Sequence, residues 1–301
     1  MVKKMVLLGV DGGGTSCRAR LAEFEGQVLG EGLSGPANIR FGLSDSFAAV
    51  ADAAKQCLDQ AGLDGANLDI IACLALAGAS EPMHLAAART HAHPFLRVLL
   101  TTDAHAACVG AHGGAPGGII IVGTGSVGWA VVDGREHRIG GWGFPVSDEG
   151  SGAWLGCEAA RRVLWAYDGK IAWSGLLETL YSRFGCDPHA IVRWMGKAHP
   201  RDFAELAPAV LEHALRDDVA ACELMRIAAG HIDTIAQRLA ALGVERIALI
   251  GGIAEGIEPW LAQATRSLLV SPKGDALSGA LRLAREEAET FILAQRKSAR
   301  G

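Results

Sequence analysis

The 301-residue sequence lacks the features of several common protein classes. Its seven cysteines include no CxxC pair, and their odd number argues against a disulfide framework or a zinc ribbon. We therefore expect reduced thiols, most of them buried as small apolar residues.

A surplus of positive charge and long apolar runs are also missing. The chain has 28 Lys and Arg against 33 Asp and Glu, a net charge of -5, so no basic face for a nucleic-acid backbone is expected. The first apolar run, MVLLGV, ends at Asp11 after six residues, which is too short for a signal peptide, and no run reaches membrane-spanning length. We expect a cytoplasmic protein with neither a nucleic acid nor a membrane as partner.

Glycine, by contrast, is abundant, with 39 residues, and half of the chain is apolar. The length suffices for two domains that each bury a core. The stretch GGAPGG (113–118) has the most flexible composition, so we place the domain boundary there, giving domains 1–115 and 116–301. The last helix is expected to pack back on the first domain.

Strand and helix patterns alternate along the chain and predict an α/β protein. The first domain opens with a strand, a glycine-rich bend, a second strand, a tight turn and a third strand. A helix over 44–61, buried strands at 68–78 and 96–103, and a short helix after Asp103 follow. The order strand–bend–strand–turn–strand returns from residue 119. Helices then dominate, with a long amphipathic stretch over about 203–242, a strand at 246–254 and a last helix over about 275–295.

The stretch IIIVGTGSVGWAVV (119–132) contains a GxGxxG pattern that is open to two interpretations. A dinucleotide fingerprint requires a helix to begin on the glycines, yet β-forming residues and the hairpin dipeptide Asp133-Gly134 follow here. The alternative is a bend between two strands whose N–H groups and hydroxyls bind phosphate. Because Gly12-Gly13-Gly14-Thr15 repeats the arrangement of Gly123-Thr124-Gly125-Ser126, we favour two phosphate hairpins. A Walker A loop is absent from the sequence.

Two aspartates carry both a structural and a functional interpretation, and two further polar residues carry a structural one. Asp11, beside the triple glycine, is either a turn residue or a Mg²⁺ ligand near a nucleotide. Asp103 is either a helix N-cap, the commoner case, or a general base. Asn38 and Asp148 have the ordinary interpretations of a loop residue and a cap for a helix beginning near Ser151.

Together, these motifs resemble the actin/sugar-kinase superfamily. VDGGGTSCRARL resembles its first phosphate motif, IIIVGTGSVGWAV its second, and RIALIGGIA its adenosine motif. More narrowly, GPANIR, TTDAHAA and GGWGFPVSDEGSGAWLG resemble the N-acetylglucosamine kinase and glucosamine kinase branch of the BadF/BadG/BcrA/BcrD ATPase family. The resemblance runs from Val10 to about Leu281.

This resemblance implies two ribonuclease-H-like domains with a nucleotide cleft between them, and a homodimer as a family-level expectation. It implies ATP-dependent phosphorylation of N-acetylglucosamine at the 6-hydroxyl, with Asp103 as the general base. Asp11 would assist Mg²⁺, and Asn38 and Asp148 would bind sugar hydroxyls. The ATP site would consist of glycines and hydroxyl residues: Gly13, Gly14, Thr15, Thr124, Gly125 and Ser126 at the phosphates, and Gly251 and Gly252 beneath the adenosine.

Three alternatives stay open. A glucosamine kinase would hold the ammonium group near a carboxylate, and Glu149 is a candidate. An ATPase that activates acyl-CoA dehydratases shares the ATP core but carries cysteines for an iron–sulfur cluster, whereas the cysteines here are dispersed. A sugar sensor would bind without turnover.

Overall fold

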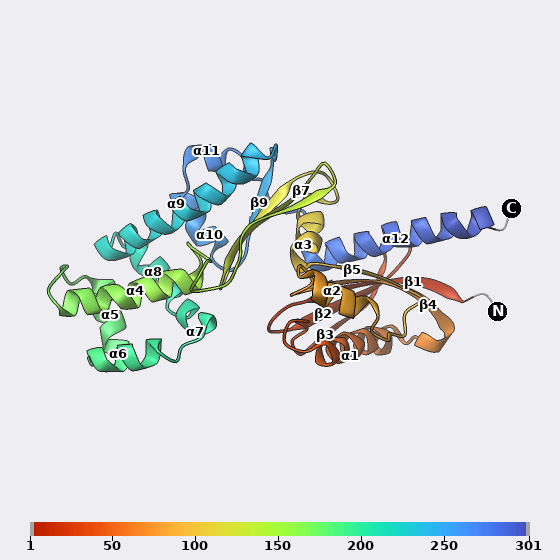
Figure 1. Ribbon diagram of the computed structural model, residues 1–301, viewed down its shortest axis with the longest axis horizontal. Helices are drawn as coiled ribbons and strands as arrows, with labels where there is room; N and C mark the ends of the chain where they lie inside the picture. The colour runs from red at the N-terminus through yellow and green to blue at the C-terminus, as the bar shows by residue number, and fades with distance from the viewer. Residues whose placement is uncertain (1–2, 299–301) are drawn as a thin grey trace. The chain divides into compact units, whose positions relative to one another are not determined.

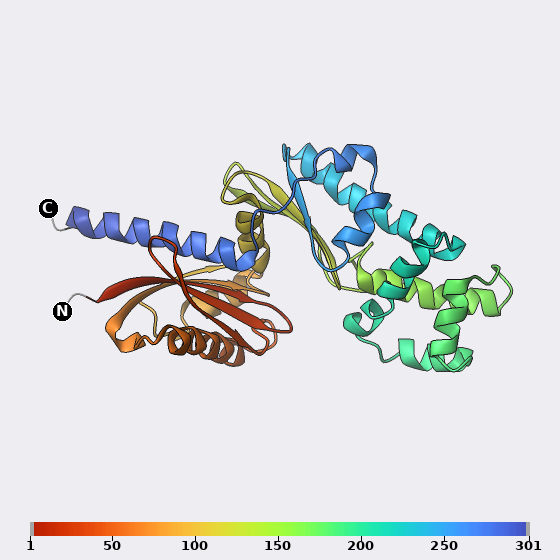
Figure 2. The same cartoon turned by 180° about the vertical axis from the view of Figure 1, so that it is seen from behind.

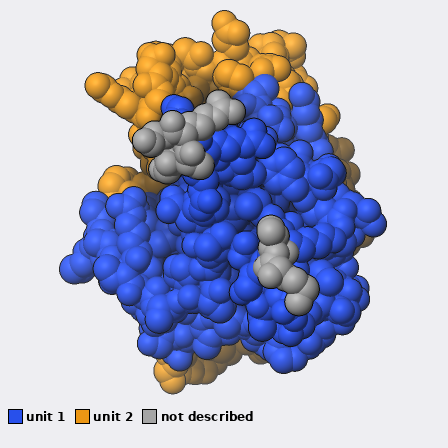
Figure 3. Space-filling model, turned by 90° about the vertical axis from the view of Figure 1, so that its right-hand side faces the viewer, with its two compact units in different colours: residues 1–115, 272–301 blue, residues 116–271 orange. Residues whose placement is uncertain are grey.

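The structure is a computed structural model that describes residues 3–298 and divides into two compact units. Of the described residues, those up to Ala115 and those from Pro272 onwards form unit 1, and Pro116–Ser271 form unit 2 (Figure 3). The domain boundaries expected from the sequence differ from these units in one respect. They assign the segment after residue 271 to the second domain, whereas the structure places its described part in unit 1.

Unit 1 is a five-stranded mixed sheet with helices on both faces. Its sheet has the order β3-β2-β1-β4-β5, in which β1 pairs antiparallel with β2 and parallel with β4. The elements are β1 (Lys4–Gly12), β2 (Cys17–Glu23), β3 (Val28–Ser34), α1 (Leu43–Ala61), η1 (Gly65–Asn67), β4 (Leu68–Leu76), α2 (Pro82–Arg89), β5 (Arg97–Thr101), α3 (Asp103–His112) and α12 (Ala276–Ser298).

Side chains of β1 alternate between the two faces of this sheet. Val6, Leu8 and Val10 pack into the core formed with α1, whereas Leu7 packs into the core formed with α12. Figures 1 and 2 show α1 and α12 on opposite faces. A strand that is buried on both faces needs a continuous apolar run, and MVLLGV provides it.

The close packing of α12 on α3 explains why the end of the chain belongs to unit 1. A Cβ on Gly110 of α3 would overlap the carbonyl oxygen of Asp275, and a Cβ on Gly279 of α12 would overlap that of Ala106. Only glycine at both positions allows the helices to approach this closely. The last helix is therefore a structural element of the first unit.

Unit 2 repeats the strand order of unit 1 with one strand fewer. Its sheet has the order β8-β7-β6-β9, with β6 antiparallel to β7 and parallel to β9. The elements are β6 (Gly118–Val122), β7 (Ser126–Val132), β8 (Arg135–Gly140), α4 (Gly152–Tyr167), α5 (Gly175–Arg183), α6 (Pro188–Met195), α7 (Pro200–Ala204), α8 (Ala207–Ala214), α9 (Val219–Ala241), β9 (Ile247–Ile250), α10 (Ala254–Ile257), η2 (Glu258–Trp260) and α11 (Gln263–Arg266).

The long amphipathic stretch expected over 203–242 consists of the end of α7 followed by α8 and α9. Asp217, which follows the end of α8, has a left-handed backbone with φ 58°, so the chain cannot continue as a helix there. The Asp218 side chain then accepts a hydrogen bond from the N–H of Ala221 and caps α9. The break is therefore encoded by turn and cap residues within an otherwise continuous apolar pattern.

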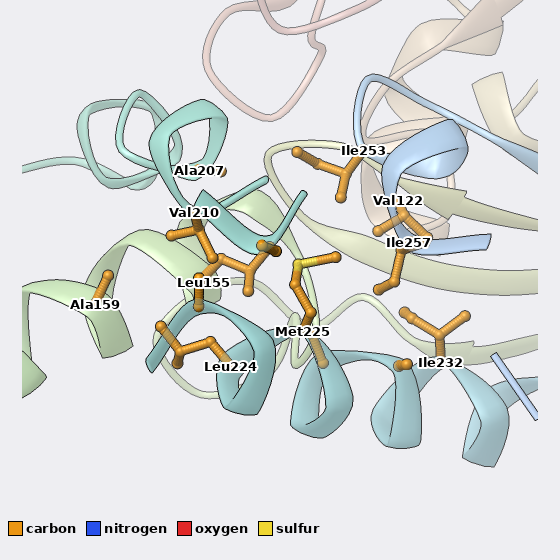
Figure 4. Close-up of a cluster of buried hydrophobic side chains, with 14 of the residues drawn as sticks. Val122, Leu155, Ala159, Ala207, Val210, Leu224, Met225, Ile232, Ile253 and Ile257 are labelled. Carbon is orange, nitrogen blue, oxygen red and sulfur yellow. The ribbon is translucent and has the colours of Figure 1, made fainter. Parts of the chain in front are cut away.

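The core of unit 2 lies between its sheet and α4 and α9. Figure 4 shows Leu155 of α4, Met225 and Ile232 of α9, and Val122 and Ile253 from the strand ends directed into one cluster. Val122 directly precedes the turn at residues 123–125, and Ile253 directly follows the turn at Gly251 and Gly252. The core therefore anchors both turns. Among residues 3–298, no helix is both long and apolar enough to cross a membrane.

Candidate active site

The first glycine-rich bend joins β1 to β2. The N–H of Gly13 donates to the carbonyl oxygen of Ser16 at 2.9 Å and closes the bend. Gly14 and Thr15 are exposed, and within residues 3–298 their N–H groups have no hydrogen-bond partner. A Cβ on Gly14 would meet nothing within 4 Å. The bend therefore presents free donors to the space above it, as a phosphate-binding turn does.

Asn38 lies beside this bend because its loop pairs with the end of β4. It forms an isolated parallel bridge with Ala77, and the N–H of Ala37 donates to the carbonyl oxygen of Gly13 at 2.9 Å. The side-chain Oδ1 of Asn38 accepts from the N–H of Arg40 at 3.1 Å. The two amide protons on Nδ2 are thus left to donate to a ligand.

Asp103 is the first residue of α3, directly after β5. The cap of this helix is Thr102, whose hydroxyl accepts from the N–H of His105 at 3.0 Å. The Asp103 carboxylate accepts from the N–H of Ala104 at 2.9 Å, and the N–H of Asp103 itself also stabilises its charged form. The capping role weighed for Asp103 thus falls to Thr102, which leaves acceptor positions of the carboxylate open.

The environment of Asp103 favours its neutral form. Burial raises the pKa of its carboxyl, the N–H of Ala104 opposes this rise, and the negative charge of Asp11 adds to it. Both carboxylates lie at the same edge of the sheet, because Asp11 is near the end of β1, Asp103 follows β5, and both strands run parallel to β4. This edge is where open α/β sheets bind ligands.

Asp11 is paired with a cation that sequence reasoning missed. The Nη2 and Nε atoms of Arg18 donate to Asp11 Oδ2 at 2.6 and 3.3 Å. The two residues face each other across the hairpin, in the register Asp11 opposite Arg18. The sequence signal for this pair is the hairpin register. Counted outward from the bend, Gly12 lies opposite Cys17, and the next pair is Asp11 opposite Arg18.

The carboxylates of unit 1 fit a magnesium ion that is bound together with phosphate. Within residues 3–298, no group of three or more His, Cys, Asp or Glu side chains could hold a metal by itself. Mg²⁺ in nucleotide sites is typically held by one or two carboxylates together with substrate phosphates. Asp11, with a side chain 19% exposed beside the open bend, fits that arrangement.

The second glycine-rich bend joins β6 to β7 and is fixed by the start of α4. The N–H of Gly123 donates to the carbonyl oxygen of Gly125 at 2.9 Å, and the N–H groups of Gly152 and Ala153 donate back to Gly123 and Thr124 at 2.8 and 3.1 Å. Thr124 is exposed at the tip, and within residues 3–298 its N–H has no partner. The buried Ser126 hydroxyl instead donates to the carbonyl oxygen of Glu149 at 2.8 Å.

Asp148 contacts this second bend directly. A Cβ on Gly125 would lie 2.7 Å from Oδ2 and 2.9 Å from Cγ of Asp148. The capping role weighed for Asp148 belongs to Ser151, whose hydroxyl accepts from the N–H of Trp154 at 3.2 Å. Burial raises the pKa of the Asp148 carboxyl. Three backbone N–H groups oppose that rise, those of Ser126, Phe144 and Gly143.

Gly251 and Gly252 follow β9 and lie against the end of β6. Gly251 has φ 110°, and a Cβ there would overlap the carbonyl oxygen of Val122, so only glycine fits. The N–H of Ile253 donates to the same oxygen at 3.0 Å. At Gly252, a Cβ would meet nothing within 4 Å. This turn therefore exposes its backbone next to the second bend, which immediately follows Val122.

Comparison with known proteins agrees with this geometry. Residues 8–277 match the BadF/BadG/BcrA/BcrD ATPase family. The chain belongs to this family. The match confirms the family that the sequence motifs resemble. Together with the similar solved structure, it also confirms the α/β fold of the actin-like ATPases.

Several named proteins are similar over nearly the whole chain. Glucosamine kinase GspK of Vibrio cholerae is 41% identical over 278 residues, which cover 92% of this chain and 95% of that protein. A structure from Chromobacterium violaceum, with a provisional N-acetylglucosamine kinase assignment, is 38% identical with a TM-score of 0.84 and covers 93% of this chain and 99% of that one. A ROK family glucokinase from Streptomyces griseus shares the fold at 18% identity, with a TM-score of 0.53 and coverage of 93% and 99%.

In this family member, the candidate residues form two groups, one in each unit. Unit 1 brings Asp11 and Asp103 to one edge of its sheet, and Asn38 lies against the bend that contains Gly13. Unit 2 brings Asp148 against Gly125 and places Gly251 on Val122. Sequence reasoning missed Arg18 and the contact between Asp148 and Gly125.

Proposed function

We propose that this chain transfers the γ-phosphoryl group of ATP to the 6-hydroxyl of an amino sugar, and that the sugar is glucosamine. Family membership and the relatives identify the chain as a sugar kinase of the N-acetylglucosamine and glucosamine kinase type. The position that is phosphorylated, the identity of the sugar and the roles of individual residues are our proposal.

The observation that carries the choice of glucosamine is the 41% identity to the Vibrio cholerae glucosamine kinase over 92% of this chain. The sequence motifs alone favoured the N-acetylated sugar. The relative changes that preference, because its similarity covers 92% of this chain.

The charges near Asp148 support an amine as the substrate group. Glu149 follows Asp148 directly, is exposed, and its negative charge adds to the rise in the pKa of Asp148. Two neighbouring carboxylates favour an ammonium group over a neutral acetamide, because a cation relieves their mutual repulsion. We therefore assign Glu149 to recognition of the sugar ammonium.

Asp103 acts as the general base in this proposal. It accepts the proton of the sugar 6-hydroxyl while that oxygen bonds to the γ-phosphorus and the bond from this phosphorus to ADP breaks. The raised pKa of its carboxyl suits a base, since a carboxylate with a higher pKa takes the proton more readily. Asn38 and Asp148 hold sugar hydroxyls and orient the nucleophile.

The glycine-rich turns hold the nucleotide. The free N–H groups of Gly14, Thr15 and Thr124 donate to phosphate oxygens, and the exposed backbone at Gly252 accommodates the adenosine. Magnesium, when bound, neutralises phosphate charge, and Asp11 is the residue that would help to hold it. Arg18 keeps the Asp11 carboxylate oriented by its two hydrogen bonds.

N-acetylglucosamine is the second candidate, and one observation favours it. The Chromobacterium violaceum structure, at 38% identity and a TM-score of 0.84, carries a provisional assignment to that sugar. An acetamide would replace the ammonium near Glu149, so the two sugars require different surroundings at one position of the ring.

The test is ADP release by the purified full chain with Mg-ATP and, in turn, glucosamine, N-acetylglucosamine, N-acetylmannosamine, glucose and no sugar. We expect the highest kcat/KM with glucosamine and a 6-phosphate product identified by phosphorus NMR. A preference for N-acetylglucosamine would replace the proposed substrate but keep the reaction. ATP hydrolysis that is independent of sugar, or no turnover with any sugar, would overturn the kinase proposal.

Glu149→Gln sharpens this test. Loss of the carboxylate removes the attraction for an ammonium group but not for an acetamide. The ratio of kcat/KM for glucosamine to that for N-acetylglucosamine should therefore fall several-fold in the variant. An unchanged ratio would remove Glu149 from amine recognition.

A further inference from the structure

Asp148 lies in direct contact with the second glycine-rich bend. Sugar binding alone does not require this contact. A methyl group on Gly125 would lie 2.7, 2.9 and 3.3 Å from Oδ2, Cγ and Oδ1 of Asp148. All three atoms of the carboxylate group thus form the surface on which Gly125 rests. Any side chain at residue 125 would displace the carboxylate or the bend.

The loop that carries Asp148 is itself fixed on the core. Asp148 has φ 71°, a left-handed conformation that costs energy for a residue other than glycine and persists only where its surroundings impose it. Its carbonyl oxygen accepts from the N–H of Ser151 at 3.2 Å. The next glycine, Gly150, has φ 79° and packs so closely on α9 that a Cβ would lie 2.6 Å from the carbonyl oxygen of Ala228. The loop that carries Asp148 is therefore held against α9 on one side and against the bend at Gly125 on the other.

The charge of Asp148 points to the same role. Asp148 is 9% exposed, and burial raises the pKa of its carboxyl, while the N–H of Ser126, at the start of β7, opposes that rise. A negative charge beside a turn that binds phosphate weakens phosphate binding through repulsion, and ordering of the turn by the same carboxylate would offset that cost. The N–H of Thr124, at the exposed tip of the same bend, has no partner within residues 3–298 and is free for a ligand.

We propose that Asp148 is a positioning residue for the second phosphate bend, and that through it sugar binding and nucleotide binding are coupled. The inference rests on the proposed function, since it takes an amino sugar and ATP as the two ligands. A sugar hydroxyl that donates to the Asp148 carboxylate holds the side chain in the place that orders Thr124 and Gly125. By linkage, each ligand then strengthens the binding of the other.

The experiment measures binding of a non-hydrolysable ATP analogue with Mg²⁺ to the full chain by calorimetry, without sugar and with saturating glucosamine. Asp148→Asn keeps the size of the side chain, and asparagine tolerates the left-handed backbone. We expect the analogue to bind about fivefold or more weakly in this variant without sugar, and glucosamine no longer to strengthen its binding. Loss of a repulsive charge alone predicts the opposite sign, namely tighter binding.

Asp217→Asn is the matched control. Asp217 is an exposed aspartate of the same unit with φ 58°, so the substitution makes the same chemical change in the same backbone conformation. Its affinity for the analogue should equal that of the wild type. Equal weakening in both variants would show that the effect does not depend on the contact between Asp148 and Gly125, and it would overturn the positioning role.

A double-mutant cycle covers the case in which Asp148→Asn folds poorly. Asp148→Gly suits the left-handed backbone and removes the side chain that Gly125→Ala would strike. Gly125→Ala should weaken binding of the analogue in the wild-type background and have a smaller effect in the Asp148→Gly background. Additive effects would overturn the proposed contact.

The outcomes separate this inference from the proposed function. Wild-type turnover of an amino sugar, combined with Asp148→Asn that binds the analogue as tightly as the wild type or tighter, would overturn the positioning role alone. A wild-type chain that binds no nucleotide would overturn both proposals.

Discussion

The two units have the same strand order around their glycine-rich bends but place their carboxylates differently. In each unit, the bend joins the central strand to an antiparallel neighbour, and a parallel strand lies on the other side, β4 beside β1 and β9 beside β6. In unit 1, a Cβ on Gly14 would contact no side chain of the described residues, and Asp103 follows the end of another strand. In unit 2, the Asp148 carboxylate lies directly against Gly125.

This difference shows how a duplicated framework acquires two tasks. The carboxylates of unit 1 are free of the bend, so they are available to a metal and to a reacting hydroxyl. The carboxylate of unit 2 is part of the support of its bend. Burial raises the pKa of both the Asp103 and the Asp148 carboxyl. At Asp103, two N–H groups oppose this rise and the charge of Asp11 adds to it, whereas at Asp148 three N–H groups oppose it and the charge of Glu149 adds to it. The contact with Gly125, which Asp148 makes, is what distinguishes the second carboxylate as a fixed acceptor.

The largest effect that tests this comparison is expected at Asp103. Asp103→Asn removes the proposed base, so kcat should fall by about 10²- to 10⁴-fold. The affinity for the ATP analogue should stay close to that of the wild type, because Asp103 does not support a bend. Steady-state kinetics and calorimetry measure the two quantities.

The contrast with Asp148→Asn decides the outcome. If the division of tasks is correct, Asp103→Asn loses turnover with intact nucleotide binding, and Asp148→Asn binds the nucleotide analogue more weakly. An Asp103→Asn chain with wild-type kcat would exclude the base role. Equal loss of nucleotide affinity in both variants would remove the distinction between the units.

The repeated bends could be predicted from the sequence because their signals are local. Each bend lies between an apolar run and a β-forming stretch, and Asp133-Gly134 marks the following turn. The positions of Asp11 and Asp103 follow from a similarly simple rule, since the residues that end parallel strands meet at one edge of the sheet. Local pattern and sheet geometry together locate most of the site in unit 1.

A second test compares alanine at the two bends. At Gly14, a Cβ meets nothing, so Gly14→Ala should change the free energy of unfolding by no more than about 0.5 kcal/mol. At Gly125, a Cβ would strike the Asp148 carboxylate, so Gly125→Ala should lower that free energy by about 1–3 kcal/mol. Urea unfolding followed by circular dichroism measures both values.

The Gly14→Ala chain has a further use. Because the substitution disturbs no protein contact, any loss of affinity for the ATP analogue reports a phosphate that approaches the backbone. Unfolding free energies that are equal for the two variants would contradict the closer contact assigned to unit 2.

The parts that sequence reasoning missed depend on contacts between distant segments. Asp148 comes after β8, and no local pattern tells that its carboxylate returns to Gly125. The amphipathic pattern of α12 predicts that one face is buried, but not that Gly110 and Gly279 join it to α3. Similarly, only the register across the hairpin pairs Arg18 with Asp11. These features become visible once the chain is folded, because each is set by packing rather than by periodicity.

The smallest expected effect concerns Arg18, whose side chain is 44% exposed beside Asp11. Arg18→Gln removes the cation that faces Asp11, so the negative charge of Asp11 acts more strongly on Asp103 and raises the pKa of that carboxyl further. A base works in its charged form, so the acid limb of kcat/KM for ATP should move to higher pH. The unfolding free energy should change by about 1 kcal/mol or less, because exposed ion pairs contribute little.

Arg18→Lys restores the positive charge without the two-point hydrogen bond and should return the acid limb to its wild-type position. A limb that moves equally in both variants would assign the effect to orientation of Asp11 rather than to charge. If the acid limb moves in neither variant, the charge of Asp11 does not influence the pKa of Asp103. The two carboxylates of unit 1 would then act independently of each other.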